Sequence, residues 1–215
     1  MMKLVYFDVR GLAETSRMVL AVGGEEYEDF RYPLKVVDMK THNMVKEEFD
    51  KDKAEGKLVR SLNKVPYLEV EGVVIPQSKS IERYLGKKYG LMGSSDIESA
   101  RVDSLCECIR DFKDLYQPVR KAENRDEAMN EWFTKTLVEK LRLFENLLDG
   151  DGYSVGDKLS LSDIVLYAFI TQFFDNKEAS MNATLISPKV RSVIDNVAKV
   201  PQIMKWLEDR PKTDF

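Results

Sequence analysis

The sequence predicts a mixed α/β domain over residues 1–89, a short linker over residues 90–96, and an all-helical domain over residues 97–215. Three observations carry this prediction. Strand-like and helix-like segments alternate before residue 90, and only helical periodicity follows. Glycine and serine, which break regular structure, are concentrated between the two halves. A chain of 215 residues with 43% hydrophobic side chains can fill two small cores.

The α/β half is predicted to follow the order β-α-β-α-β-β-α. A first strand at 3–8 precedes a helix at 13–22, which Gly23 and Gly24 stop. A strand at 27–34 and a short charged helix at 47–55 come next. Residues 65–76 hold two β-rich runs around Glu71-Gly72, which predicts a hairpin, and a helix follows at 79–89. Strands joined through helices pair in parallel and hairpin strands antiparallel, so we expect a mixed four-stranded sheet.

The second half is predicted to be helical throughout. Apolar residues recur at helical spacing over 97–119 and again over 129–148. Ser160 and Asp163 have the spacing of a capping box, and they precede a segment, 164–174, that is apolar on nearly all sides. A helix of that composition belongs in a core. Two shorter helices are expected at 189–198 and 202–209.

Composition and charge exclude several classes of protein. The 33 basic and 37 acidic residues leave a net charge of -4, without the clustered basic footprint of a nucleic-acid binder. No apolar run is long enough to span a bilayer, and the first residues are too short an apolar run for a signal peptide, so we expect a cytoplasmic protein. Cys106 and Cys108 lie two apart on a helix and therefore on different faces, which argues against a disulfide. His42 is the single histidine, so no metal site is expected.

Two local features of the first half can bind a ligand. Val65-Pro66 opens a strand, and its peptide bond can be cis or trans. In the cis form the backbone groups of Val65 would face outward and could pair with an extended peptide. Gln77-Ser78 precedes a helix, where Ser78 can cap the helix and the free N–H groups can receive a carboxylate. Each feature also has an ordinary structural interpretation, as a plain turn and a plain helix cap.

Taken together, the motifs resemble the glutathione S-transferase family, and most of all its sigma-type branch, which uses a tyrosine. The matching runs are residues 4–14, the Lys64-Val65-Pro66 turn with its hairpin, and residues 77–81. In the second half the match continues through residues 159–163, Val200-Pro201, Trp206, Arg210 and Pro211. The resemblance spans nearly the full length and implies a thioredoxin-like first domain followed by the helical domain.

The resemblance also implies roles for particular residues. Tyr6 would donate a hydrogen bond to the glutathione sulfur, and Val65, before a cis Pro66, would pair with the cysteinyl backbone. Gln77 and Ser78 would hold the γ-glutamyl carboxylate. The remaining implied contacts are Phe49, Lys53 and Lys64 at the glycyl end, and Asp111 reaching the γ-glutamyl amine across a dimer interface. By pattern alone, Tyr6 can equally be a core aromatic, Asp111 part of a solvated acidic face, and Lys53 a surface charge.

The implied function is conjugation of the glutathione thiolate to small hydrophobic electrophiles by a homodimeric, metal-free enzyme whose co-substrate is glutathione. The electrophile pocket would lie between the domains, near Val9, Leu12, Phe112 and Phe215. Two alternatives remain: a glutathione-dependent isomerase of the prostaglandin synthase kind, and a non-catalytic scaffold protein that kept the fold. Ser16, although it is a hydroxyl residue, lies further into its helix and ranks below Tyr6 as the thiol-activating group.

The sequence departs from the family pattern at several of these positions. Leu12 stands where many sigma-type members have arginine, Phe49 where tryptophan is common, and residues 61–63 replace a Pro-Phe-Gly. Glu107 and Arg110 occupy two positions where prostaglandin D synthases of this branch carry acids. The residues at these two positions, Glu107 and Arg110, put metal stimulation and prostaglandin specificity in doubt.

Overall fold

A computed structural model of the chain describes residues 1–38 and 43–213. Its contacts divide into two compact units, Met1–Leu85 together with Asp209–Phe215, and Gly86–Glu208. The sequence placed the boundary at residues 90–96 and gave everything after it to the helical domain. The clustering of contacts instead groups the segment after Glu208 with the first unit, where Arg210 forms an ion pair with Glu14.

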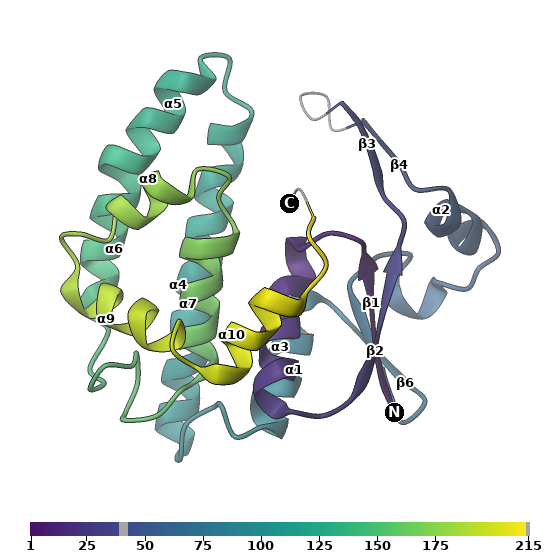
Figure 1. Ribbon diagram of the computed structural model, residues 1–215, viewed down its shortest axis with the longest axis horizontal. Helices are drawn as coiled ribbons and strands as arrows, with labels where there is room; N and C mark the ends of the chain where they lie inside the picture. The colour runs from purple at the N-terminus through teal and green to yellow at the C-terminus, as the bar shows by residue number, and fades with distance from the viewer. Residues whose placement is uncertain (39–42, 214–215) are drawn as a thin grey trace. The chain divides into compact units, whose positions relative to one another are not determined.

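The first unit is built on the predicted mixed sheet. Its strands are β1 (Met2–Phe7), β2 (Tyr27–Tyr32), β5 (Tyr67–Val70) and β6 (Val73–Pro76), in the spatial order β2-β1-β5-β6. β1 pairs in parallel with β2 and antiparallel with β5, which forms the hairpin with β6. In Figure 1, α1 (Glu14–Gly23) and α3 (Ser78–Lys88) lie on one side of this sheet and α2 (Glu47–Ala54) on the other. The predicted thioredoxin-like arrangement is therefore confirmed.

The sequence missed a second, two-stranded sheet in this unit. β3 (Lys35–Asp38) and β4 (Asn43–Val45) pair antiparallel between β2 and α2. Two short 3-10 turns were also not predicted, η1 (Gly11–Ala13) and η2 (Val59–Ser61). β2 ends at Tyr32, two residues earlier than expected, directly before Pro33, which has no N–H to donate to a strand pairing.

Aromatic side chains fill the core on the α2 side of the sheet. The buried cluster consists of Val5, Tyr32, Phe49, Leu58 and Tyr67. The Phe49 ring packs with its centroid 5.1 Å from that of Phe7 and 5.6 Å from that of Tyr32, the latter edge to face. Such tilted contacts are the favoured geometry of aromatic pairs. α2 is thereby fixed to the sheet through Phe49, its one buried residue.

The second unit is helical, as predicted. Its elements are α4 (Asp96–Arg120), α5 (Arg125–Glu131), the π-helical segment η3 (Trp132–Thr136), α6 (Leu137–Glu145), α7 (Leu161–Gln172), α8 (Lys177–Asn182), α9 (Pro188–Val197) and α10 (Pro201–Asp209). α7 packs against α4, α8 and α9, and its residues from Leu161 to Ile170 are all buried. The apolar segment thus forms the central helix of this unit.

One predicted helix is interrupted. The sequence indicates a single helix over 129–148, whereas the structure has α5, a π-helical turn and α6. The interruption falls on Trp132 and Phe133, which are adjacent in the chain and both buried. A regular helix turns successive side chains by about 100°, and a π-bulge relaxes that constraint. The Phe133 ring contacts Tyr116 and Phe174, and the Trp132 ring contacts the same two residues.

The predicted capping box is present at the start of α7. Both carboxylate oxygens of Asp163 accept bonds: Oδ2 from the Ser160 N–H at 2.7 Å, and Oδ1 from the Ser154 N–H at 2.6 Å. The Ser160 hydroxyl donates to the same Oδ2 at 2.7 Å. Asp163 is completely buried, and burial raises the pKa of its carboxyl against the lowering effect of these donors. The box therefore fastens the 154–160 loop to the central helix.

Candidate functional site

The strand register brings the predicted site segments to one edge of the first unit's sheet. Val5 of β1 lies opposite Tyr67 of β5, and Tyr67 lies opposite Pro76 of β6. Tyr6 directly follows Val5 in the chain. Pro66 directly precedes Tyr67, and Gln77 directly follows Pro76. Three segments that are distant in the sequence therefore end at the same side of the sheet.

Tyr6 lies near the end of β1, and its hydroxyl is held by one backbone group. The Tyr6 Oη accepts a hydrogen bond from the Leu12 N–H at 3.2 Å. The side chain is 8% exposed, so the phenol is neither fully enclosed nor solvated. Among the described residues, no group accepts a hydrogen bond from the Tyr6 O–H. The hydroxyl thus keeps its proton available for a ligand atom that enters from the exposed side.

The loop between β1 and α1 fits closely around this phenol. Gly11 has a φ of +40°, and a Cβ added there would lie 2.6 Å from the Tyr6 Oη and 2.9 Å from its Cε1. Such distances are well inside van der Waals contact, so the ring can occupy this position only because residue 11 has no side chain. Glycine is required at this position both by the backbone conformation and by the tyrosine.

The environment of Tyr6 keeps its hydroxyl protonated. Burial raises the pKa of Tyr6, and the Leu12 N–H and the nearby Arg17 charge oppose that rise. The net direction is upward from an ordinary value that is already far above neutral pH. At physiological pH the Tyr6 side chain is therefore a hydrogen-bond donor and not a phenolate base.

At the next segment, the Val65-Pro66 peptide bond is cis. Pro66 is buried, and β5 begins only at Tyr67. Within the described part of the chain, neither the N–H nor the C=O of Val65 has a backbone partner. Half-buried backbone groups without partners are rare, and they are suited to pair with an extended peptide that adds to the sheet edge.

Gln77 and Ser78 form the start of α3. Gln77 has a φ of +75°, a region that a residue with a side chain seldom adopts. Its C=O accepts the Ile81 N–H at 3.0 Å, which makes Gln77 the N-cap of the helix, with Ser78 its first residue. The expected cap at Ser78 is therefore displaced by one position. The N–H groups of the first helical turn face away from the helix and remain available for an anion.

The predicted contacts at the glycyl end separate into two kinds. Lys53 and Lys64 are exposed, and neither forms an ion pair with a residue that the structure describes. Lys57 differs, because its ammonium contacts both Asp52 and Glu55 at 2.8 Å. Phe49 is a core residue at 6% exposure, with its ring packed on other aromatics. Its burial argues against the expected contact with a ligand and leaves the two lysines as the cationic groups.

The remaining predicted residues belong partly to the first unit and partly to the second. Leu12 is exposed at 55%, while Val9 is buried at 6%. In the second unit, the Phe112 ring is half-buried and contacts the rings of Phe144 and Phe169, as a core residue does. The Asp111 side chain is 68% exposed, with the Arg110 Nη2 at 4.0 Å. Phe215 lies outside the described residues, as does His42.

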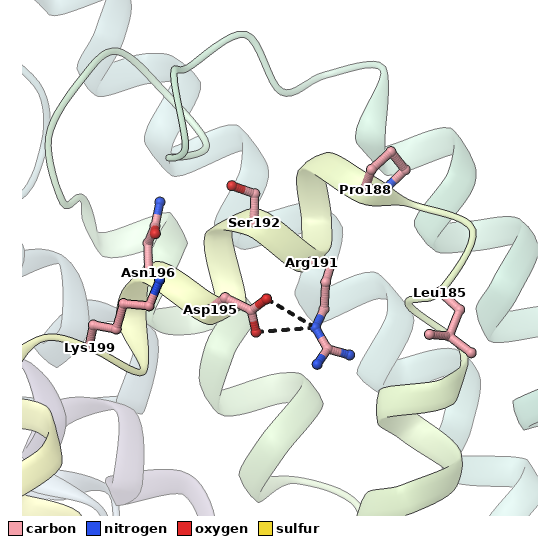
Figure 2. Close-up of a pocket in the computed structure, with 7 residues that line it drawn as sticks. All are labelled: Leu185, Pro188, Arg191, Ser192, Asp195, Asn196 and Lys199. Atoms are coloured by element: carbon pink, nitrogen blue, oxygen red, sulfur yellow. Dashed lines mark hydrogen bonds and ion pairs between the residues drawn. The ribbon is translucent and has the colours of Figure 1, made fainter.

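A hollow of about 520 Å³ lies elsewhere, along one face of α9 (Figure 2). Its lining comes from the second unit alone: Leu185, Pro188, Arg191, Ser192, Asp195, Asn196 and Lys199. No residue expected at the site is among them. The Arg191 Nε donates to both carboxylate oxygens of Asp195, at 3.1 and 3.3 Å. The hollow therefore contains an internally neutralised surface pair and no part of the predicted chemistry.

The residues that the structure describes include neither a metal-binding cluster nor a membrane-spanning helix. Over the described residues, no group of three or more histidine, cysteine, aspartate and glutamate side chains is arranged to hold a metal ion. Over residues 1–38 and 43–213, no helix has both the length and the apolar composition that crossing a bilayer requires.

Sequence reasoning missed two residues that shape this site, Gly11 and Arg17. Gly11 falls within the matching run 4–14, but nothing in that run predicts its contact with Tyr6. Arg17 interrupts an otherwise apolar stretch of α1 and is completely buried there. A lone arginine within a buried helix face was the available signal, because such a charge is retained only where it has partners.

Comparisons with known proteins show which family the chain belongs to. The family model for the glutathione S-transferase N-terminal domain matches residues 2–87, and that for the C-terminal domain matches residues 111–210. Hematopoietic prostaglandin D synthase of Gallus gallus is 31% identical over 212 residues, covering 98% of this chain and 97% of that protein. Glutathione S-transferase 1 of Ascaris suum is 29% identical over 221 residues, covering 99% and 98%.

Solved structures give the same result. The structure of a monomeric glutathione S-transferase from the hookworm Necator americanus has a TM-score of 0.81 and 29% identity, covering 100% of this chain and 99% of that one. Rat hematopoietic prostaglandin D synthase has a TM-score of 0.77 and 26% identity, covering 100% and 99%. Both halves of the sequence and the entire fold therefore place this chain in the glutathione S-transferase family.

Proposed function

We propose that this glutathione transferase joins the glutathione thiolate to small hydrophobic electrophiles and that the Tyr6 hydroxyl activates the thiol. The observation that carries the proposal is the free proton of a hydroxyl whose oxygen is fixed by the Leu12 N–H at 3.2 Å. The hydroxyl donates to the sulfur and stabilises the thiolate, and the thiol proton leaves to solvent. The thiolate then attacks the electrophilic carbon to form a thioether, and the electron pair of the broken bond leaves with the departing group, chloride in the case of 1-chloro-2,4-dinitrobenzene.

The magnitude of this effect is sufficient. A free thiol has a pKa near 8.5. A hydrogen bond to a charged group contributes about 1.5–3 kcal/mol, which corresponds to roughly one to two pKa units. The bound thiol would then have a pKa near 7, so about half of it is ionised at neutral pH without a general base.

Binding of the tripeptide is divided among three parts of the unit. The unpaired backbone groups of Val65 support pairing with the cysteinyl backbone. The start of α3 at Gln77 and Ser78 supports binding of the γ-glutamyl carboxylate, since the helix dipole and free N–H groups favour an anion. Lys53 and Lys64, as exposed unpaired cations, support binding of the glycyl carboxylate. The contact of Asp111 with the γ-glutamyl amine of a partner's glutathione is proposed from the resemblance alone.

The decisive experiment is the substitution Tyr6→Phe. It removes the hydroxyl and keeps the ring, so retention on glutathione-agarose should persist. Conjugation of glutathione to 1-chloro-2,4-dinitrobenzene should fall by about tenfold to a hundredfold near neutral pH, from the energy of one charged hydrogen bond. The thiol pKa of the complex, followed by the ultraviolet absorbance of the thiolate, should rise in the same variant. Unchanged turnover would exclude Tyr6 as the activating group.

A second candidate activity is glutathione-dependent isomerisation, because one relative at 31% identity is named a hematopoietic prostaglandin D synthase. The same thiolate would serve both activities. Against it, Arg110 forms an ion pair with Glu107 at 3.1 Å, which places a cation among the acids of α4. Assays with an aromatic electrophile and with prostaglandin H2 would separate the two activities. Binding of glutathione with neither turnover would favour the scaffold alternative.

A homodimer and a cytoplasmic location remain predictions. One relative of the same fold is described as monomeric, so membership of the family does not decide the assembly. Analytical ultracentrifugation of the full chain across a range of concentrations would measure it directly.

A further inference from the structure

We propose that Arg17 is a positioning residue for Tyr6: it fixes the loop that holds the Tyr6 hydroxyl and places a buried positive charge beside the phenol ring. The proposal rests on the proposed role of Tyr6 in activating the thiol. Arg17 itself need not touch glutathione. Its effect would reach the sulfur through the position and the donor strength of one hydroxyl group.

The first part of the argument is a short chain of contacts. Arg17 lies on α1 with no exposed surface, and its Nη1 donates to the Val9 carbonyl at 2.7 Å. Val9 is the second residue of the tight loop after β1. Three residues later, the Leu12 N–H donates to the Tyr6 Oη. The guanidinium therefore fixes one end of the segment whose other end holds the hydroxyl.

The second part is the charge. The Arg17 Cζ lies 6.0 Å from the centroid of the Tyr6 ring, at the outer limit of cation–π range. The buried Arg17 Nη2 has no hydrogen-bond acceptor in the described chain. The Arg17 charge also lowers the pKa of Tyr6 against the effect of burial. A more acidic phenol is a stronger donor to a thiolate.

Arg17 is not the sole cation on either of its acidic partners. It contacts Asp29 at 3.2 Å and Glu14 at 3.8 Å. Asp29 also pairs with Arg31 at 2.7 Å, and Glu14 also pairs with Arg210. When Arg17 is removed, each of these carboxylates therefore keeps a positive partner. An unpaired buried charge is the usual reason why losing one member of a buried ion pair destabilises a protein.

The charged and titratable groups that face Arg17 come from three elements and the C-terminal segment. They are Tyr6 on β1, Tyr27, Asp29 and Arg31 on β2, Glu14 on α1, and Arg210. Burial raises the pKa of Tyr27, so this phenol stays neutral below pH 10. The pKa values of Tyr6, Tyr27 and Arg31 are all raised from ordinary values of 10 or above, so none of these three groups changes charge between pH 6 and 9. A change in the thiol titration over that range therefore reports the thiol itself.

The test compares Arg17→Met and Arg17→Lys with Arg31→Met in the full-length protein. Arg31→Met removes the other cation on Asp29 and serves as the matched control for loss of a network charge. We expect Arg17→Met to raise the thiol pKa of the glutathione complex by about one unit and to lower kcat/KM near pH 6.5 by about tenfold. The Michaelis constant for glutathione should stay within about twofold. Arg17→Lys keeps the positive charge but lacks the planar guanidinium. Its thiol pKa and kcat/KM should lie between those of Arg17→Met and those of the unmodified enzyme.

A double-mutant cycle separates this proposal from the role of Tyr6. In the Tyr6→Phe background, Arg17→Lys should leave the thiol pKa unchanged, because the hydroxyl through which it acts is absent. An equal shift in both backgrounds would overturn the positioning role, as would an Arg17→Met protein whose thiol pKa matches that of the unmodified enzyme. If Arg17→Met does not fold, the cycle with Arg17→Lys decides. A Tyr6→Phe protein with an unshifted thiol pKa would instead refute the proposed function.

Discussion

Gly11→Ala should lower the activity of the enzyme by displacing the Tyr6 hydroxyl, without replacing any side chain that is proposed to bind glutathione. The new Cβ would lie 2.6 Å from the Tyr6 Oη and 2.9 Å from its Cε1, so the ring must move away from the Leu12 N–H. Gly24→Ala is the matched control. Gly24 also has a positive φ, +65°, but a Cβ there meets nothing within 4 Å. The two substitutions share a backbone cost and differ in the contact with the phenol.

The expected losses of stability and activity follow from the backbone cost and from the contact with the phenol. Placing alanine in the left-handed region costs about 1–2 kcal/mol, and both variants should lose that much free energy of unfolding. Gly11→Ala adds an overpacking cost of about 1–3 kcal/mol. Its larger effect is on catalysis: loss of the hydrogen bond to the sulfur should lower kcat/KM by about tenfold to a hundredfold.

Urea denaturation measures the stability of each variant, and conjugation of glutathione to 1-chloro-2,4-dinitrobenzene measures activity. Gly24→Ala should be somewhat less stable and as active as the unmodified enzyme. The reasoning would be refuted by a folded Gly11→Ala protein that retains the activity of Gly24→Ala. That result would mean that the position of the Tyr6 hydroxyl does not control the reaction.

Three further predictions concern other parts of the structure. Because the pKa of Tyr6 is raised, its hydroxyl stays protonated even at a pH equal to the ordinary pKa of tyrosine. A plot of kcat/KM against pH should therefore rise as the thiol ionises and then stay level up to about pH 9. A fall before that pH would contradict the role assigned to Tyr6. Lys53→Ala and Lys64→Ala should each raise the Michaelis constant for glutathione about two- to fivefold at unchanged kcat, while Lys57→Ala, whose ammonium is already paired, should leave both constants as they are. Asp163→Ala should lower the free energy of unfolding by about 3–5 kcal/mol in urea titrations, since three buried donors lose their acceptor; a loss below about 1 kcal/mol would show that the capping box is dispensable.

Most elements of the fold were predictable because local rules decide them. Alternation of strand and helix patterns, the Glu71-Gly72 turn and the glycines after α1 fixed the order of the mixed sheet. The capping box was evident from the spacing of Ser160 and Asp163, since a cap is formed by residues three apart. The short pieces were missed. β3, β4 and α8 have too few residues for a period to show, and the π turn depends on how Trp132 and Phe133 pack.

The site residues divide in the same way. Tyr6, the Val65-Pro66 turn and Gln77-Ser78 could be proposed from the sequence because each belongs to a short motif with a fixed order. The family resemblance assigned Phe49 to a ligand contact, whereas in the structure its ring packs in the aromatic core around Tyr32. Spacing along a helix defines which residues share a face. It does not define what that face meets.

The sequence by itself determined the two-part organisation, the element order of the mixed sheet and the residue types available for thiol chemistry. Those properties follow from periodicity, turn residues and caps, which act over a few neighbouring positions. Only the tertiary structure decided that Gly11 makes room for the phenol, that Arg17 lies buried beside it, and that the Val65-Pro66 bond is cis. Each of these depends on packing between elements, whose energy is set by residues far apart in the chain and is therefore not written in any local pattern.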